Sequence, residues 1–182
     1  MFREMRRYRQ RLPENEAIRI LEQGSSGVLA VLGDSGYPYA VPLSYVYADH
    51  TIYFHCADSG HKLDALRRHE QVCFCVISCD NVVPQEYTTY YRSVIAFGRA
   101  RELTDTAERH RALRLLACKY HPTDSEEGRT RAIETDDARV CVVAISVEHL
   151  TGKEGRELSL RRRKQMSAAD TGEAESSHTG VT

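Results

Sequence analysis

The segment from Tyr53 to Leu66 contains the residues whose types and spacing are best suited to binding a small ligand. An apolar, strand-like run ends at Ala57, the turn Asp58-Ser59-Gly60 follows, and an amphipathic helical pattern begins with Lys62 in its first turn. Main-chain N–H groups at a helix start have no partner within the helix, and the helix dipole is positive there. With a nearby ammonium group they can bind a phosphate dianion. The pattern therefore indicates a phosphorylated cofactor.

An ordinary strand–turn–helix connection has the same appearance, so that alternative stays open. The turn is neither a Walker loop nor a dinucleotide fingerprint. Asp58 also argues against the phosphate, because it places an anion beside the proposed dianion. The neighbouring His55 and Cys56 lie at the mouth of this turn and are candidates to line the site. The sequence places no general base beside Cys56, so it does not support a nucleophilic thiol.

The size and charge of the chain narrow the class of partner. With 182 residues and a formal net charge of −1, the chain has the length of one domain and no global positive field. A small-molecule ligand is therefore expected in preference to nucleic acid. No apolar run approaches the roughly 20 residues of a membrane helix, and the N-terminus lacks a signal-peptide pattern. We expect a cytoplasmic protein without a membrane partner.

Six cysteines raise the question of a metal site or disulfides. The C-x-C-x3-C spacing of Cys73, Cys75 and Cys79 matches no common zinc pattern, and no histidine follows at the usual distance. We expect no metal. These three residues, Cys118 and Cys141 lie within apolar strand or helix patterns, so we expect them to be reduced and buried.

The order of predicted elements favours a mainly β fold. Apolar periodicity and turn residues predict helices at 13–23, 61–69, 104–120 and 126–135, and strands at 28–32, 37–48, 51–56, 71–79, 90–103 and 139–147, with a polar loop at 80–89. Gly98 predicts a bulge or a close backbone approach within its strand. Three strands in a meander, an inserted helix and a late return strand favour a small Greek-key barrel. We expect one domain over residues 1–154 and a polar, disordered tail over 155–182.

Five short segments recur together in a fixed order: Gly27-Val28-Leu29-Ala30, Tyr37 to Tyr45, Tyr53 to Ala57, Gly60-His61-Lys62, and Tyr91 to Ala100. In this order and spacing the chain resembles the pyridoxamine phosphate oxidase-like split-barrel flavoproteins, and among them the nitroimidazole-resistance (Nim) group, over about residues 2 to 155.

The resemblance implies a six-stranded split β-barrel with flanking helices and a homodimer that binds FMN at the subunit interface. The implied cofactor-binding residues are Val41, Pro42, Leu43, Ser44, Tyr45, His55, Cys56, Ala57, Gly60, His61, Lys62, Ser93 and Val94. His55 is also the catalytic candidate, although an inward structural histidine is the plainer interpretation. Pro42 and Tyr45 could equally be structural, Arg92 could pair with phosphate or with a carboxylate such as Glu86, and Lys153 matches a family position.

The implied activity is an FMN-dependent oxidoreductase that takes electrons from NAD(P)H or another donor and reduces a small electron-poor acceptor such as a nitroimidazole. Three alternatives stay open: a flavin-binding or sensor module without turnover, oxidation of pyridoxine phosphate, and a haem or deazaflavin ligand in the same fold. The basic run Arg161 to Arg163 is a poor match to the substrate-binding pattern of the oxidation reaction.

Overall fold

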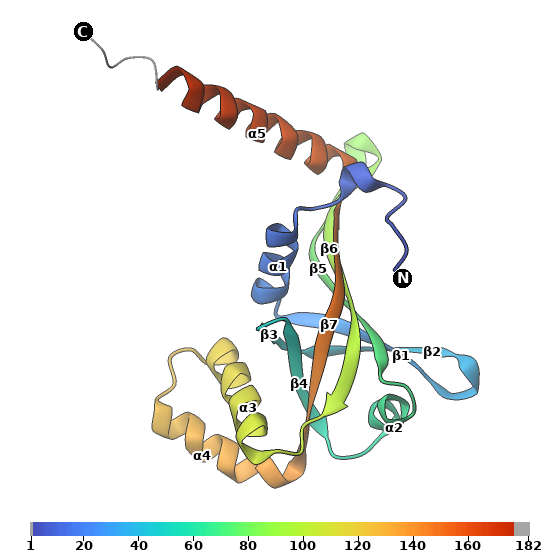
Figure 1. Ribbon diagram of the computed structural model, residues 1–182, viewed down its shortest axis with the longest axis vertical. Helices are drawn as coiled ribbons and strands as arrows, with labels where there is room; N and C mark the ends of the chain where they lie inside the picture. Colours follow the sequence, from blue (N-terminus) through green and yellow to red (C-terminus); the bar gives the residue numbers. More distant parts are fainter. Residues whose placement is uncertain (1, 177–182) are drawn as a thin grey trace.

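The computed structural model describes residues 2–176, with side chains as far as residue 166 except for that of residue 138. Within these residues, one seven-stranded antiparallel sheet is flanked by five α-helices (Figure 1). The strands are β1 Ser26–Leu32, β2 Pro38–Ser44, β3 Val46–Ala48, β4 Thr51–Ala57, β5 Gln71–Val83, β6 Thr88–Glu102 and β7 Val140–Glu154; the helices are α1 Glu14–Gln23, α2 His61–Arg68, α3 Thr106–Tyr120, α4 Glu126–Asp136 and α5 Arg156–Ser176. The mainly β class is confirmed, but the predicted number of six strands is wrong.

The sheet is an incompletely closed barrel. Its strand order is β2-β1-β5-β6-β7-β4-β3, so the two edge strands, β2 and β3, are consecutive in the chain. Tyr45 alone separates them, which brings the edges together at one point although they share no ladder of hydrogen bonds. The main core fills the inside of this curved sheet, with Leu29, Phe54, Phe74 and Val94 among its fully buried side chains.

The seventh strand arises because Tyr45 divides one predicted strand into β2 and β3. The sequence predicted a continuous strand over 37–48, but the structure interrupts it here. The Tyr45 N–H donates to the Tyr120 hydroxyl at 2.9 Å, and the Tyr45 carbonyl oxygen lies 2.8 Å from the same hydroxyl. A side chain from α3 thus takes both backbone groups that a neighbouring strand would use. The predicted three-stranded meander is therefore wrong, because β2 pairs with β1 at one edge while β3 pairs with β4 at the other.

Two further expectations differ from the structure. The polar loop predicted at 80–89 is mostly strand, because β5 continues to Val83 and β6 begins at Thr88. Of the cysteines expected to be buried, Cys118 is exposed and Cys141 is buried, while the other three are half-buried; all are free thiols. Within the tail predicted at 155–182 the chain forms α5 over Arg156–Ser176, and residues 177–182 lie outside the described residues.

The remaining helices and the bulge agree with the sequence. The Asp105 carboxylate caps α3 by accepting a hydrogen bond from the Glu108 N–H at 2.9 Å. The pairing of β6 with β7 shifts register between Phe97 and Gly98, where a Cβ on Gly98 would lie 2.2 Å from the Ser146 carbonyl oxygen. No helix in the described part of the chain is both long and apolar enough to cross a membrane.

Candidate functional site

The turn between β4 and α2 has the backbone geometry of an anion site. Gly60 precedes the first residue of α2 with φ of 123°, a conformation that glycine adopts without strain. No side chain of the described residues caps this helix start. The N–H groups of the first turn therefore face solvent without a side-chain acceptor. Such a helix start can accept a phosphate.

Lys62 supplies a cation at this turn. Its ammonium lies 5.9 Å from the centre of the Phe54 ring, and residues 2–166 provide no ion-pair partner for it. It also lies beside the Cys56 thiol: burial raises the pKa of Cys56, and Lys62 partly offsets that rise. His61 is held differently, because its ring stacks on Tyr39 at 4.2 Å and its Nε2 lies 3.5 Å from an Asp34 carboxylate oxygen.

The alternation of β4 places His55 and Cys56 on opposite faces of the sheet. Cys56 packs against the main core, whereas His55 is exposed on the outward face. There His55 and Ser44 line an open cavity of about 360 Å³ beneath α3 and α4. The other lining residues are Leu113, Leu116, Ala117, Tyr120, Ala132, Ile133, Asp136 and Val140. The plainer interpretation of His55 as an inward core residue does not hold.

The segment Val41 to Tyr45 divides between the two faces. Pro42 and Ser44 are exposed, while Val41 and Leu43 are half-buried. Tyr45 has no exposed surface: its hydroxyl donates to the Leu21 carbonyl at 2.7 Å. Burial raises the pKa of the Tyr45 hydroxyl. The side chain of Tyr45 is therefore a core element, so only its backbone is placed to contact a ligand.

Two residues of α3 that the sequence analysis did not single out support this strand break. Lys119 donates to the Gly24 carbonyl at 2.6 Å, and its ammonium lies 4.3 Å from the centre of the Tyr45 ring. Burial lowers the pKa of Lys119. The Tyr120 hydroxyl binds both backbone groups of Tyr45. Their adjacency at the end of a helix was the signal in the sequence, but their contacts depend on the tertiary fold.

Ser93 and Val94 lie far from the turn at α2 within one chain. Val94 is fully buried, and Ser93 is half-buried and pairs with Lys153 on β7. His55 pairs with Val142 on the same strand. Eleven residues of β7 separate these two partners, which is about 35 Å of strand at ~3.3 Å per residue. That distance follows β7 only: Ile95, two residues from Ser93, lies in one row with Pro42 of β2, so within one chain Ser93 is near the β2 candidates and distant along the strands from the turn at α2.

The outward face of the central strands is unusually apolar. Across the sheet, one row of opposed residues contains Pro42, Val28, Cys75, Ile95 and Thr151, and the next contains Ala40, Ala30, Cys73, Phe97 and His149. Ile95 and Phe97 keep 36% and 37% of their surface exposed. An antiparallel sheet with one solvated face ordinarily carries polar residues there. We call these two rows the outer apolar face; it has the composition of an interaction surface.

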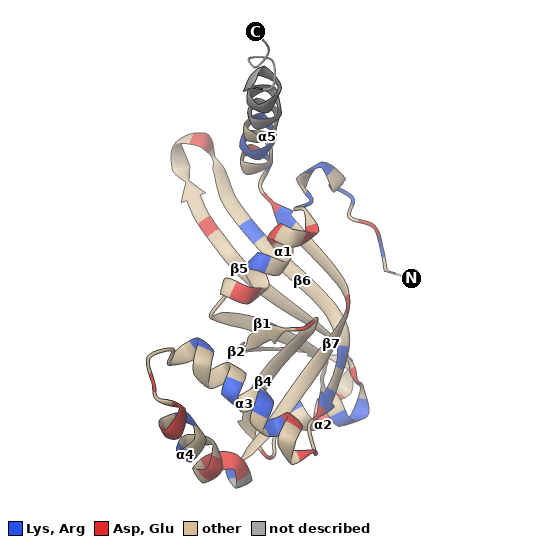
Figure 2. Cartoon of the chain, turned by 60° about the vertical axis from the view of Figure 1, so that its left-hand side comes forward, with Lys and Arg blue, Asp and Glu red and all other residues tan. Residues whose placement is uncertain are grey.

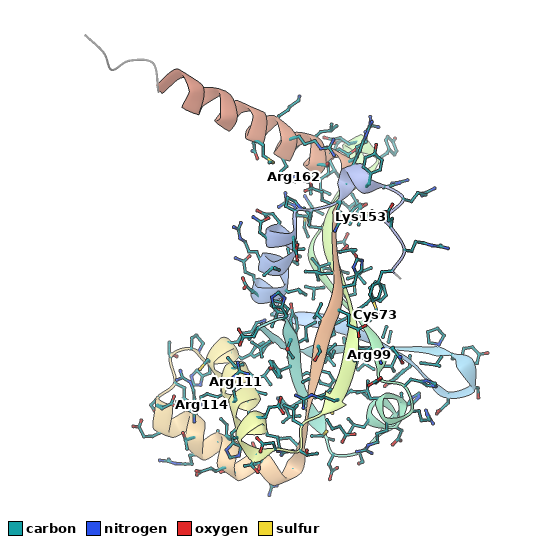
Figure 3. All side chains as sticks on the ribbon, in the orientation of Figure 1. Cys73, Arg99, Arg111, Arg114, Lys153 and Arg162 are labelled. Atoms are coloured by element: carbon teal, nitrogen blue, oxygen red, sulfur yellow. The ribbon has the colours of Figure 1, made fainter. Side chains whose placement is uncertain are left out.

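The side chains of Arg92 and Lys153 both contact other side chains of the same chain. The Arg92 guanidinium pairs with a carboxylate, as one of its two alternatives held, but the partner is the buried Glu154 at 3.2 Å and not Glu86. Arg162 binds the other carboxylate oxygen of Glu154 at 2.8 Å. The Lys153 ammonium lies 5.5 Å from the centre of the Tyr91 ring. Figure 3 shows Lys153 and Arg162 close to the start of α5.

Comparison with known proteins decides the family. The family model described as pyridoxamine 5′-phosphate oxidase matches residues 13–154, which include every candidate residue named above. The chain belongs to this family. The resemblance drawn from the sequence motifs is thereby confirmed at the level of the family. No curated protein matches the chain.

Solved structures share the fold at low sequence identity. A conserved hypothetical protein from Mycobacterium tuberculosis has a TM-score of 0.72 at 20% identity, covering 85% of this chain and 92% of that chain. A candidate 5-nitroimidazole antibiotic resistance protein from Bacteroides thetaiotaomicron has a TM-score of 0.67 at 23% identity, covering 79% of this chain and 86% of that chain. An FAD-binding protein from Mesorhizobium loti has a TM-score of 0.59 at 24% identity, covering 80% of this chain and 96% of that chain. Identities this low support a shared split-barrel fold and nothing more specific.

Proposed function

We propose that this protein is an FMN-binding flavoprotein that reduces small electron-poor acceptors such as nitroimidazoles, with electrons from NAD(P)H or another donor. The observation that carries the proposal is the turn before α2 in a member of the pyridoxamine 5′-phosphate oxidase family. There a helix start without a side-chain cap lies beside Lys62, which has no ion-pair partner among residues 2–166. The described residues fit the cofactor because this turn offers N–H donors and a cation with no competing carboxylate in contact with Lys62.

The residues of this chain would divide the work of binding. Gly60, His61 and Lys62 would hold the phosphate. β2 is an edge strand that pairs only with β1, so its other side leaves backbone donors and acceptors for the edge of a flat ring. Pro42 removes one donor from that row and limits pairing with another strand. When bound, a flavin supplies hydride transfer between donor and acceptor.

His55 is the candidate for proton transfer. It is exposed in the cavity that it shares with Ser44, which leaves room for a small acceptor beside it. An imidazole can donate or accept a proton near neutral pH. We infer that His55 orients the acceptor or protonates the reduced product. His55→Ala should then lower the rate of nitroimidazole reduction more than it lowers the melting temperature; the reverse would make His55 structural.

The proposal includes a homodimer formed through the outer apolar face. Ser93 lies two residues from Ile95 on the strand that carries this face, so a second copy packed there would bring its own residues close to a flavin held along β2 of the first. A two-fold axis pairs the same patch on both subunits. Phe97→Asp should yield monomers in analytical ultracentrifugation. The matched control is Tyr87→Asp, at a hairpin residue that is 98% exposed. A dimer that survives Phe97→Asp would contradict this interface.

The test of the flavin site compares two ligands that differ only in the phosphate. Lys62→Gln should weaken FMN binding at least tenfold and leave riboflavin binding unchanged, because a charge-assisted hydrogen bond contributes about 1.5–3 kcal/mol. Arg131→Gln on α4 removes an equal charge elsewhere and should change neither. Equal losses for both ligands would reject the phosphate assignment, and protein that remains colourless in excess FMN would reject the flavin.

FAD is a second candidate for the cofactor. Gly60 is exposed, and the space at its Cβ position holds no atom within 4 Å, which leaves room for a second phosphate. The Mesorhizobium loti protein of the same fold is an FAD-binding protein. Chromatography of the chromophore released by acid separates FMN from FAD. A flavin module without turnover would bind the cofactor, yet its reduced flavin would not be reoxidised faster by a nitroaromatic.

A further inference from the structure

A second pocket lies at the opposite end of the long strands from α2. It has a volume of about 380 Å³ and is lined by Arg6, Arg7, Tyr8, Arg9, Gln10, Arg156, Ser159, Leu160 and Arg163. The first five of these belong to the N-terminal segment that contains the 3-10 turn η1 (Tyr8–Gln10), and the last four belong to α5. β7 runs about 46 Å, at ~3.3 Å per residue, from Val140, which pairs with Ala57 beside the turn before α2, to Glu154 at the start of α5 (Figure 1).

The geometry of α5 aims one of its faces into the pocket. Arg156, Ser159, Leu160 and Arg163 follow the i, i+3, i+4, i+7 spacing of a single helix face. The Ser159 hydroxyl donates to the Arg9 carbonyl at 2.8 Å, and the Arg163 guanidinium donates to the same oxygen. These bonds tie the two ends of the described chain together. The walls of the pocket are thereby fixed relative to each other.

The charge of the pocket is not neutralised. Five of its nine lining residues are arginines and none is acidic. Among residues 2–166, no carboxylate forms an ion pair with Arg6, Arg7 or Arg156, whereas the nearby Arg162 is paired with Glu154. Figure 2 shows Lys and Arg positions both in the N-terminal segment and in the first part of α5. This concentration of positive charge occurs in a chain whose formal net charge is −1.

Two further features indicate a ligand. The Gln10 Oε1 atom is buried in this region and has no hydrogen-bond partner in the described structure. Buried polar atoms are ordinarily satisfied, so this amide oxygen lacks a donor, which a hydroxyl or ring N–H group of a ligand would provide. Tyr8 and Leu160, which are 68% and 50% exposed, offer apolar surface beside the arginines. One guanidinium group can donate two parallel hydrogen bonds to the oxygens of a phosphate, and an aromatic side chain can stack on the flat ring of a ligand.

We propose that this pocket binds a phosphorylated small molecule of nucleotide size, with its phosphates on the arginines and its ring against Tyr8 and Leu160. The site is separate from the proposed flavin turn of the same chain and does not depend on it. Because the pocket joins the N-terminal segment to α5, an occupant would hold both in place.

The test titrates adenosine 5′-diphosphate into the full-length, FMN-saturated protein by calorimetry. We expect saturable binding that weakens as salt rises, with adenosine and pyrophosphate each binding at least tenfold more weakly. The double variant Arg7→Gln/Arg156→Gln should weaken the diphosphate at least tenfold. The equal-charge control Arg19→Gln/Arg131→Gln should leave its affinity within twofold. If the double variant does not fold, the exposed single variant Arg7→Gln should still weaken binding at least threefold.

Four results would overturn the proposal. These are no saturable binding at millimolar nucleotide, equal weakening in the control variant, pyrophosphate binding as tightly as the nucleotide, and displacement of FMN by the nucleotide. The last result would place the nucleotide in the flavin site.

Discussion

Replacing Tyr120 with phenylalanine removes one hydroxyl from the point where the two sheet edges meet. That hydroxyl accepts the Tyr45 N–H at 2.9 Å and lies 2.8 Å from the Tyr45 carbonyl and 2.5 Å from the Ser25 carbonyl. Tyr45 is fully buried, and loss of this hydroxyl leaves its N–H without a protein partner. Each neutral hydrogen bond contributes roughly 1 kcal/mol, and an orphaned buried donor costs about 1–3 kcal/mol. We expect Tyr120→Phe to lower the free energy of unfolding by about 2–3 kcal/mol.

Guanidinium chloride denaturation at fixed protein concentration measures this loss. With a slope near ~4 kcal/mol/M for a chain of this size, the midpoint should fall by roughly 0.6 M. Tyr37→Phe is the matched control, because Tyr37 is 76% exposed and its hydroxyl has no hydrogen-bond partner among the described residues. It should leave the midpoint unchanged. A Tyr120→Phe protein within about 0.5 kcal/mol of the wild type would refute the assignment of the strand break to this hydroxyl.

Three other changes test the structure. Gly98→Ala should lower the melting temperature with a loss of about 1–3 kcal/mol, because the new methyl group would lie 2.2 Å from the Ser146 carbonyl oxygen; an unchanged calorimetric transition would contradict this close approach. Burial, with a hydrogen bond to a carboxylate, raises the pKa of the Cys141 thiol from 9.0 to about 12. Folding thus favours the protonated thiol, so the free energy of unfolding should fall as the pH rises from 9 towards 12. The fall should be less steep in Cys141→Val, and parallel curves for the two proteins would contradict this prediction. Glu154→Gln removes the carboxylate that Arg92 and Arg162 share and should cost about 3 kcal/mol in urea denaturation, because Glu154 is fully buried but both arginines are partly exposed; equal stability would mean that these ion pairs contribute nothing.

Local signals in the sequence predicted most elements well. α1, α2 and α3 lie within one or two residues of their predicted bounds, because capping residues and apolar spacing act within a few turns. Gly98 was recognised as a bulge for a similar local reason. The β5–β6 hairpin was predicted too short, because its polar residues between Asp80 and Thr89 are held by cross-strand backbone bonds that do not depend on side-chain type.

The candidate site could be predicted only in part. The turn at Gly60 and Lys62 was readable because its glycine, its helix start and its cation are adjacent in the chain. His55 could not be assigned to a face of the sheet from the sequence alone. The structure places it outward beneath α3 and α4, in a cavity with Ser44, which belongs to the opposite edge of the sheet.

The sequence by itself determined most of the element types, the mainly β class and the ordered motifs of the pyridoxamine 5′-phosphate oxidase family. These features follow from the spacing of apolar, turn and capping residues that are close together in the sequence. The tertiary structure alone decided that Tyr45 breaks a strand, that the outer face of the sheet is apolar, and that arginines from both chain ends share one pocket. Each of these features depends on tertiary contacts between groups that are distant in the sequence. Hydrogen bonding and burial at those contacts outweigh local secondary-structure propensity.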